Sequence, residues 1–485
     1  MADLLPEMSP AIQALVRASY GVLLFLTLAW VWPHRRRYFL SDRWGGYAES
    51  QPSVDWIHNP VAAPLALLLW AACAIALAAG VYVIPAAVLN LLLCRFFFVQ
   101  MRWKGVLRGM GAPGFMTYWL GAVVLALEYT SRHAPDLHRL ALLVAQVDFA
   151  LIMLSAGVYK WTAGYAQGHG MDLGMVNPEW GYWWRRFRRV RTDHVLFRVL
   201  NHMAWLTEVA AAVLMLIPIP QLRAAGGLAM SASFVFIWTQ IRLGWLAEIV
   251  FVCGLLFVYP GHIVDGFIAS WLTVAPSSVV EGPALLNAVL WTALWAYLIL
   301  LPVAHAGLFY NFYGRARLPG PLQSALERYT NFFGIIIWRV FSADHLNFFV
   351  RIWHEPRGGG RRELVSWYGS LRALRYAQVA ECIAVTTVFT TLKYFATNRA
   401  LFESRLRRYA NTVPCDGAHV LVFEYVSIQK TDTRFAYVPV MEFVVDLQAE
   451  TIETRLLDPA FDPTAAASTS PVHEGSVPGS YAPAR

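Results

Sequence analysis

The sequence predicts a mainly α-helical, polytopic membrane protein, in which a transmembrane bundle of about nine helices is followed by a small C-terminal α+β domain. Of the 485 residues, 57% are hydrophobic and only 14% are charged, whereas soluble proteins carry about 25% charged residues. Long apolar runs occupy roughly the first 310 residues, and β-rich runs occur only after them. One membrane domain and one polar domain therefore account for the chain.

The composition divides the chain into four stretches. A transmembrane domain covers 1–315, a connecting segment covers 316–337, and the α+β domain covers 338–463. The last stretch, 464–485, is small, polar and rich in proline and glycine, so we expect it to be disordered.

Nine apolar runs approach the length needed to cross about 30 Å of hydrocarbon at 1.5 Å per residue. These runs are 13–32, 61–79, 81–100, 115–129, 140–159, 199–218, 225–241, 245–260 and 285–309. A further run, 379–395, is short and contains Glu381 and Lys393. It is predicted to be a buried helix of the C-terminal domain.

Basic residues are concentrated in alternate loops between these runs. The basic loops contain Arg35, Arg36, Arg37 and Arg43, then Arg102, Lys104 and Arg108, then Arg185, Arg186, Arg188, Arg189 and Arg191. The positive-inside rule therefore predicts a cytoplasmic C-terminal domain and an external N-terminus in a bacterial inner membrane. The net charge of +8 is assigned to contacts with anionic membrane lipids and not to nucleic acid, because the arginines lie at the ends of apolar segments.

The C-terminal domain is predicted to contain two β-hairpins separated by a helical stretch. The sequence "FFVRIWHEPRGGGRRELVSWY" has the pattern strand, glycine turn, strand, and three glycines between β-rich runs suit a hairpin connection. The second hairpin is "HVLVFEYVSIQKTDTRFAYVPVMEFVVDL", with a polar turn at Lys430–Thr433. Such a domain can bind a protein or peptide partner by strand addition or packing.

Motifs of soluble enzymes and of metal sites are missing from the sequence. The five cysteines form no C-x-x-C pair, and His133 and His138 are five residues apart, so they do not share a helix face. No metal is therefore predicted.

Polar residues at apparent membrane depth predict an intramembrane pocket. They are Asp148, Glu208, Gln240, Arg242 and Glu248. A charge at this depth costs about 2.5–3.5 kcal/mol on insertion scales, so such side chains pair, become neutral or line a cavity. Two alternatives follow: structural ion pairs, for example of Arg242 with Glu208 or Glu248, or a polar pocket within the bundle.

Lys160 follows one of the apolar runs, in the stretch "SAGVYKWTAGYAQGHGM". A lysine at a helix end can be an anchor whose ammonium reaches the lipid headgroups. It can also be a partly desolvated base that takes a proton from a weak acid. Asp148, Ser155 and Tyr159 lie at positions i, i+7 and i+11, close to one helix face that leads toward Lys160.

The stretch "AGVYKWTAGYAQGHGM" resembles, without a gap, the segment of vitamin K-dependent γ-glutamyl carboxylases that carries their base lysine. The matching positions are Ala156, Gly157, Val158, Lys160, Ala163, Gly168 and Met171, and Tyr165 stands where that family tends to have tryptophan. Weaker likeness continues across 200–260 and returns in "VRIWHEPRGGGRRELVSWY", "ESRLRRYAN", "YVSIQKTDTRF" and "TRLLDPAFD", in the carboxylase order. The wider group that these segments resemble is the HTTM family.

The resemblance implies a carboxylase-like lyase or a related oxygen-dependent membrane enzyme. In this interpretation Lys160 is the general base acting on a reduced quinone of the vitamin K type, with O2 and CO2 as further reactants, and Tyr159, Trp161 and Tyr165 line the cofactor pocket. Ile237 and Gln240 stand where the carboxylases have histidine and asparagine, and the predicted orientation is opposite to that of the animal enzymes. The alternative is a noncatalytic membrane subunit or assembly factor that retains the HTTM scaffold.

Overall fold

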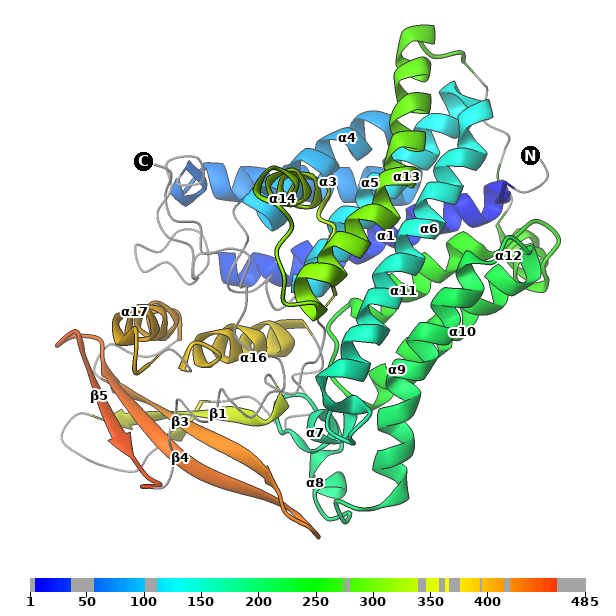
Figure 1. The fold of residues 1–485 in the computed structure, drawn as a ribbon. Coiled ribbons are helices and arrows are strands. Elements are labelled where there is room, and N and C mark those ends of the chain that lie inside the picture. Colours follow the sequence, from blue (N-terminus) through cyan, green and yellow to red (C-terminus); the bar gives the residue numbers. More distant parts are fainter. Residues whose placement is uncertain are drawn as a thin grey trace.

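The computed structural model describes residues 5–35, 56–100, 111–272, 274, 280–338, 346–356, 363–365, 376–392, 395–413 and 419–459. Helices form the larger part of the molecule, and a twisted sheet with two helices lies beside them (Figure 1). The predicted tail at 464–485 lies outside the described residues.

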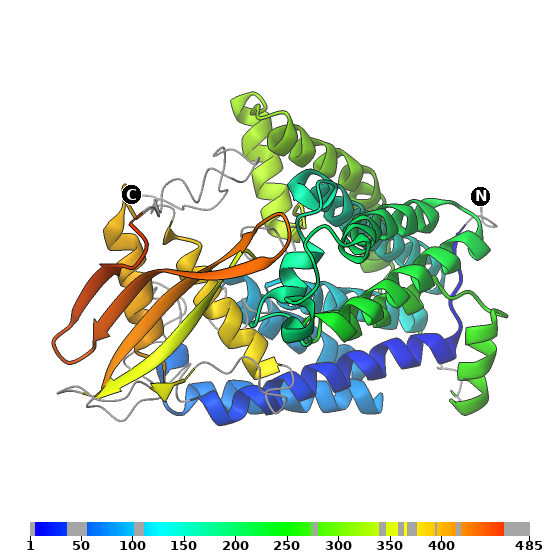
Figure 2. The same cartoon turned by 90° about the horizontal axis from the view of Figure 1, so that it is seen from below.

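The helical part contains helices of very different lengths. They are α1 (Pro10–Val31), α3 (Ala62–Ala79), α4 (Val83–Cys94), α5 (Gly111–His133), α6 (Pro135–Lys160), α7 (Met171–Val176), α8 (Trp184–Phe187), α9 (Val195–Leu216), α10 (Pro220–Gln240), α11 (Leu246–Gly254), α12 (Ile263–Trp271), α13 (Ala284–Tyr313) and α14 (Gly320–Phe333). Figure 2 shows α1 and α3 running together along one edge of the bundle.

Six helices of the described chain are long and apolar enough to cross a membrane, which indicates an integral membrane protein. They are α1, α3, α6 with the turn that follows it, α9, α10 and α13. Within the described residues, six of the nine predicted runs therefore meet this length and composition. The run 81–100 is divided between α4 and a π-helical turn, and 245–260 between α11 and a 3₁₀ turn. The run 115–129 lies within α5, whose C-terminal part also carries Glu128 and Arg132.

The C-terminal domain is an antiparallel sheet with helices on one face (Figure 1). Its strands, in the spatial order β2-β1-β3-β4-β5, are β1 (Phe348–Pro356), the two-residue β2 (Glu363–Leu364), β3 (His419–Lys430), β4 (Phe435–Asp446) and β5 (Thr451–Leu456). Both predicted hairpins are present, since β1 pairs with β2 and β3 pairs with β4. Strand β5, which pairs with β4, was not predicted.

Helix α16 (Tyr376–Phe389) connects the two hydrophobic cores. Its residues Val379 and Cys382 belong to the core of the bundle, whereas Val385 and Phe389 pack with the sheet and with α17 (Arg399–Ala410). This is the run that the sequence predicted to be a buried helix of the C-terminal domain. The helix therefore attaches the sheet to the membrane domain.

Two features near the predicted connecting segment differ from expectation. The segment 316–337 contains α14, which lies crosswise to α13 (Figure 1). Trp338, expected to begin the C-terminal domain, instead packs in the bundle, where its ring stacks on Phe234 with 6.5 Å between centroids. Its backbone N–H donates to Ser155 Oγ at 3.1 Å.

Helices α6 and α9 approach each other closely at Gly157. A Cβ atom built on Gly157 would lie 2.7 Å from Val209 Cγ2 and 3.1 Å from Glu208 Cβ. Such distances are shorter than normal van der Waals contact, so only glycine permits this helix spacing.

We predict that Gly157→Ala destabilises the protein by about 1–3 kcal/mol, because the added methyl group overpacks the contact between α6 and α9. The measurement is the thermal unfolding midpoint in detergent. Gly266→Ala is the matched control, since a Cβ there meets no atom within 4 Å. Equal midpoints for the two variants would contradict the close approach of α6 and α9.

Candidate functional site

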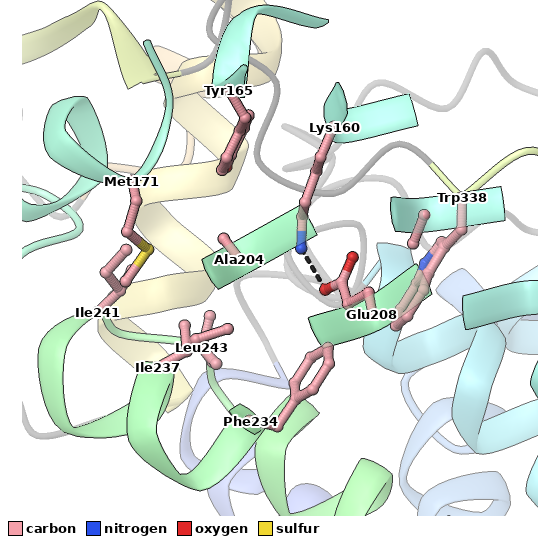
Figure 3. Close-up of a pocket in the computed structure, with 11 residues that line it drawn as sticks. Lys160, Tyr165, Met171, Ala204, Glu208, Phe234, Ile237, Ile241, Leu243 and Trp338 are labelled. Carbon is pink, nitrogen blue, oxygen red and sulfur yellow. Dashed lines mark hydrogen bonds and ion pairs between the residues drawn. The ribbon is translucent and has the colours of Figure 1, made fainter. Parts of the chain in front are cut away.

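Lys160 lies inside the bundle and not at a headgroup boundary. Its ammonium donates a hydrogen bond to Glu208 Oε1, forming an ion pair between α6 and α9 (Figure 3). The side chain of Lys160 is 5% exposed and that of Glu208 is 0% exposed. An anchor needs an ammonium in contact with headgroups, so this burial does not fit the anchor role.

The geometry around Lys160 depends on the end of α6. Lys160 is the last residue of α6, and a π-helical turn, Trp161–Tyr165, follows it. Gly164 in this turn has φ of 107°, a conformation that favours glycine. The turn directs Tyr165 into the bundle, whereas Trp161 remains 52% exposed. Single π-helical turns of this kind occur frequently at functional sites.

A small, largely apolar cavity surrounds the ion pair (Figure 3). Its lining residues are Ala156, Lys160, Tyr165, Met171, Ala204, Glu208, Phe234, Ile237, Ile241, Leu243 and Trp338. The cavity volume is about 10 Å³, which is close to the minimum that holds one water molecule.

Two polar atoms in the lining lack a hydrogen-bond partner within the described chain. They are Glu208 Oε2 and the indole Nε1 of Trp338, and both are buried. The Tyr165 ring centroid lies 6.0 Å from Lys160 Nζ, at the outer limit of a cation–π contact. The cavity therefore combines one ion pair, one unpaired acceptor and one unpaired donor with apolar walls.

Of the three aromatic residues predicted to line the cofactor pocket, only Tyr165 does so. Tyr159 is buried elsewhere, with its ring 5.9 Å from that of Phe312. Trp161 stacks on Trp205 at the outside of the bundle. Trp161 and Tyr165 are four positions apart and would share a face of a regular helix, but the non-helical backbone of Ala163 and Gly164 between them breaks that periodicity.

Of the five residues predicted to form the intramembrane pocket, only Glu208 lines the cavity. Asp148 lies elsewhere and accepts hydrogen bonds from Trp119 and Tyr297, both at 2.8 Å. Gln240 donates to Thr239 at the end of α10. Glu248 is in the first turn of α11 and does not line the cavity.

The ion pairs of Arg242 with Glu208 or Glu248, given as examples of one of the two alternatives, are not found among the described residues. The Arg242 guanidinium instead donates to the backbone carbonyl groups of Pro178, Glu179 and Gly181, at 3.0–3.3 Å. Arg242 therefore holds the loop after α7 by hydrogen bonds to main-chain oxygens, while Glu208 pairs with Lys160.

The sequence analysis missed Trp338 as a site residue. The residue is 178 positions beyond Lys160, in a segment assigned to the boundary of the C-terminal domain. The only sequence signal was Ser155, which lies on the helix face that leads to Lys160 and accepts the Trp338 backbone N–H. The position of Ser155 on this helix face does not show which residue would bind it.

A second, wider cleft of about 420 Å³ lies where the loop after the π-helical turn meets the β3–β4 hairpin. Lys430, at the end of β3, donates to Asp172 Oδ2 at 3.0 Å and to the carbonyl of Gly168 at 2.8 Å. Asp172 is fully buried and also accepts from the backbone N–H of Gly170 and from Asn201 on α9. The hairpin tip thus holds the loop that follows the Lys160 segment.

Glu179 lies at the contact between the two domains. Its Oε1 accepts the backbone N–H of Val350 on β1 at 2.9 Å, and its Oε2 accepts from Thr386 on α16 at 3.4 Å. Burial raises the pKa of Glu179 to about 8, although both hydrogen bonds act in the opposite direction. The carboxyl group therefore keeps its proton at neutral pH while it connects the domains.

Comparisons with protein-family models, with curated proteins and with solved structures gave no match to this chain. The described residues also contain no group of three or more histidine, cysteine or acidic side chains that could hold a metal. The assignment of roles in the site therefore depends on its geometry and on the motifs quoted above.

We predict that Lys160→Met destabilises the protein by about 3–5 kcal/mol, because it leaves the Glu208 carboxylate buried without its partner. The double variant Lys160→Met/Glu208→Leu should recover most of this loss, since an apolar pair leaves no buried charge. Unfolding midpoints of the two single variants and the double variant form the measurement.

Arg191→Met is the matched control, because the Arg191–Asp193 pair is exposed and exposed pairs contribute little to stability. Strictly additive losses for Lys160 and Glu208 would show that the two side chains do not interact.

We predict that the unfolding midpoint of the protein falls as pH rises toward and through about 8. The folded state binds the Glu179 proton more tightly than the unfolded chain, whose carboxyl has the ordinary pKa of 4.5. The stabilisation is therefore complete below 4.5 and is lost as pH rises through about 8. Glu179→Gln should flatten this part of the profile, and Glu403→Gln, on α17, should not. An unchanged profile in Glu179→Gln would assign the pH dependence to another group.

Proposed function

We propose that the chain is a carboxylase-like (HTTM) membrane protein in which Lys160 and Glu208 form a proton-transfer centre. The observation that carries the proposal is a lysine–glutamate ion pair buried between two membrane-length helices beside a cavity. Burying such a pair is often no more stabilising than an apolar pair of similar volume. Stability alone therefore does not explain why these two residues occupy this position.

The contact between the two groups supports general-base chemistry. Transfer of one proton from the Lys160 ammonium to the Glu208 carboxylate produces a neutral amine and a neutral acid, with no change in net charge. A neutral amine can then accept a proton from a weak acid. Glu208 thus provides a place for the proton that Lys160 must release before it can act as a base.

The reduced quinone implied by the resemblance does not fit the cavity described here. Small-molecule sites usually have volumes of about 300–1,000 Å³, and the cavity around Lys160 measures about 10 Å³. No step involving a quinol, O2 or CO2 is therefore derived. The proposal is limited to proton transfer by Lys160 and Glu208 with a weak acid whose identity the experiment below must supply.

The position of the arginine run supports a cytoplasmic C-terminal domain. Thr192, directly after that run, donates to the carbonyl of Thr431 in the β3–β4 turn at 2.8 Å. The Arg188 guanidinium lies 4.0 Å from the ring centroid of Tyr437 on β4. The basic loop and the sheet are therefore on the same side of the bundle, and the positive-inside rule assigns that side to the cytoplasm.

The second candidate is a noncatalytic subunit or assembly factor. The small size of the cavity favours it, and so does the exposed edge strand β5, whose residues are exposed or half-buried. A strand at a sheet edge offers backbone hydrogen-bonding groups to a partner segment. In this role the ion pair would only position α6 against α9.

We predict that any turnover of a weak acid by the purified protein in nanodiscs requires Lys160, and the measurement is proton release or uptake after addition of membrane-soluble weak acids, short-chain quinols among them. Lys160→Met should lower the rate by about 10²–10⁴-fold, the usual contribution of a general base. Glu128→Gln is the control, because it alters a buried carboxylate that pairs with Arg17 and Arg132 outside the cavity. Full activity in folded Lys160→Met would remove Lys160 from the mechanism. No turnover of any added weak acid, together with a stoichiometric protein partner, would favour the subunit role.

A further inference from the structure

We propose that the cavity beside Lys160 binds a single water molecule between Trp338 Nε1 and Glu208 Oε2. The inference rests on the proposed function and deepens it, because this water would solvate the carboxyl group that receives the Lys160 proton. It starts from two unpaired atoms in one lining: a buried donor on Trp338 and a buried acceptor on Glu208. Figure 3 shows the Trp338 indole beside the Glu208 carboxylate.

The unpaired atoms have complementary chemistry. The indole N–H can only donate, and a carboxylate oxygen can only accept. Leaving either group buried and unpaired costs about 1–3 kcal/mol or more. A water molecule accepts from the first, donates to the second and satisfies both.

The size of the cavity limits the ligand to one small molecule. A water molecule needs about 10–15 Å³ of such space and two to four polar partners. The cavity provides about 10 Å³, together with the indole N–H, the carboxylate oxygen and the nearby Lys160 ammonium. Apart from Tyr165, the remaining lining, including Phe234 and Leu243, is apolar, and the volume leaves no room for a chain of waters there.

The charge of the site indicates a neutral ligand. The charges of the Lys160 ammonium and the Glu208 carboxylate cancel each other. A bound cation or anion would therefore add an uncompensated charge to a buried site, which costs free energy. Neutral O2 and CO2 have no hydrogen atom to donate to Glu208 Oε2. Water is the small molecule that meets the requirements of charge, size and hydrogen bonding together.

This position gives the water a defined role in proton transfer. The water donates a hydrogen bond to Glu208 Oε2, while Lys160 donates to Oε1 of the same carboxylate. When a proton passes from Lys160 Nζ to Glu208 Oε1, one N–H bond breaks and one O–H bond forms, and the water remains hydrogen-bonded to Oε2 before and after the transfer. Trp338 positions the water and does not itself transfer a proton.

High-resolution structures in nanodiscs, determined by electron cryomicroscopy, test the proposal with the wild type, Trp338→Phe and Trp183→Phe. We expect an isolated density at about 2.7–3.2 Å from Trp338 Nε1 and Glu208 Oε2 in the wild type. Trp338→Phe should lose this density. Trp183→Phe, which removes an indole donor to the Thr239 carbonyl outside the cavity, should keep it.

Three results would overturn the inference: an empty cavity, a protein acceptor bound to Trp338 Nε1, or an elongated density that only a larger molecule explains. A second measurement covers the case in which Trp338→Phe does not fold. The ultraviolet resonance Raman spectrum in H2O and D2O reports whether an indole N–H is hydrogen-bonded. With isotope-labelled tryptophan incorporated at position 338 alone, a free N–H signal would contradict a bound water.

The two proposals can fail separately. Turnover that depends on Lys160 in a protein without the water density would overturn only the water assignment. A clear water density in a protein whose Lys160→Met variant keeps full turnover would overturn only the proton-transfer function.

Discussion

An ammonium and a carboxylate that are both withdrawn from solvent must remain in contact, because each would otherwise be a buried charge without compensation. Lys160 and Glu208 meet this requirement between α6 and α9. The contact needs two helices at unusually close spacing, which Gly157 permits. It also needs small residues at its sides, and Ala156 and Ala204 occupy those lining positions. The packing of the central helices and the geometry of the site therefore follow from one constraint.

The C-terminal domain is attached to the same region of the bundle. Asn177 donates to the backbone carbonyls of Leu346 and Phe348 at 3.0 and 2.7 Å, so the loop after α7 holds the start of β1. Lys430, at the hairpin tip, donates a hydrogen bond to Asp172. Glu179 accepts hydrogen bonds from Val350 on β1 and Thr386 on α16. These contacts lie in the segment that follows the π-helical turn. Movement of the sheet would therefore be transmitted to the loop next to Lys160, with no need for a contact to the ion pair itself.

The buried polar groups of the bundle are distributed among separate sites. Asp148 accepts hydrogen bonds from two neutral donors, and Arg242 donates hydrogen bonds to main-chain carbonyl groups. Glu208 instead forms an ion pair with a lysine. Each hydrogen-bond arrangement offsets the cost of burying a polar group, but of these three only the last one places an acidic side chain in contact with an amine. That difference is why the Lys160–Glu208 pair, and not the other intramembrane residues, is the candidate for proton transfer.

The sequence by itself determined the helical membrane class, most helix positions and both hairpins, and it singled out Lys160 as a candidate. These features depend on composition, on local periodicity and on one short motif, all of which act over a few residues. Only the tertiary structure decided that Glu208 is the partner of Lys160, that Trp161 faces outward and that Trp338 closes the cavity. The direction of a side chain after a π-helical turn, and contacts between residues 48 or 183 positions apart, depend on how whole helices pack. Local sequence patterns carry no information about that packing.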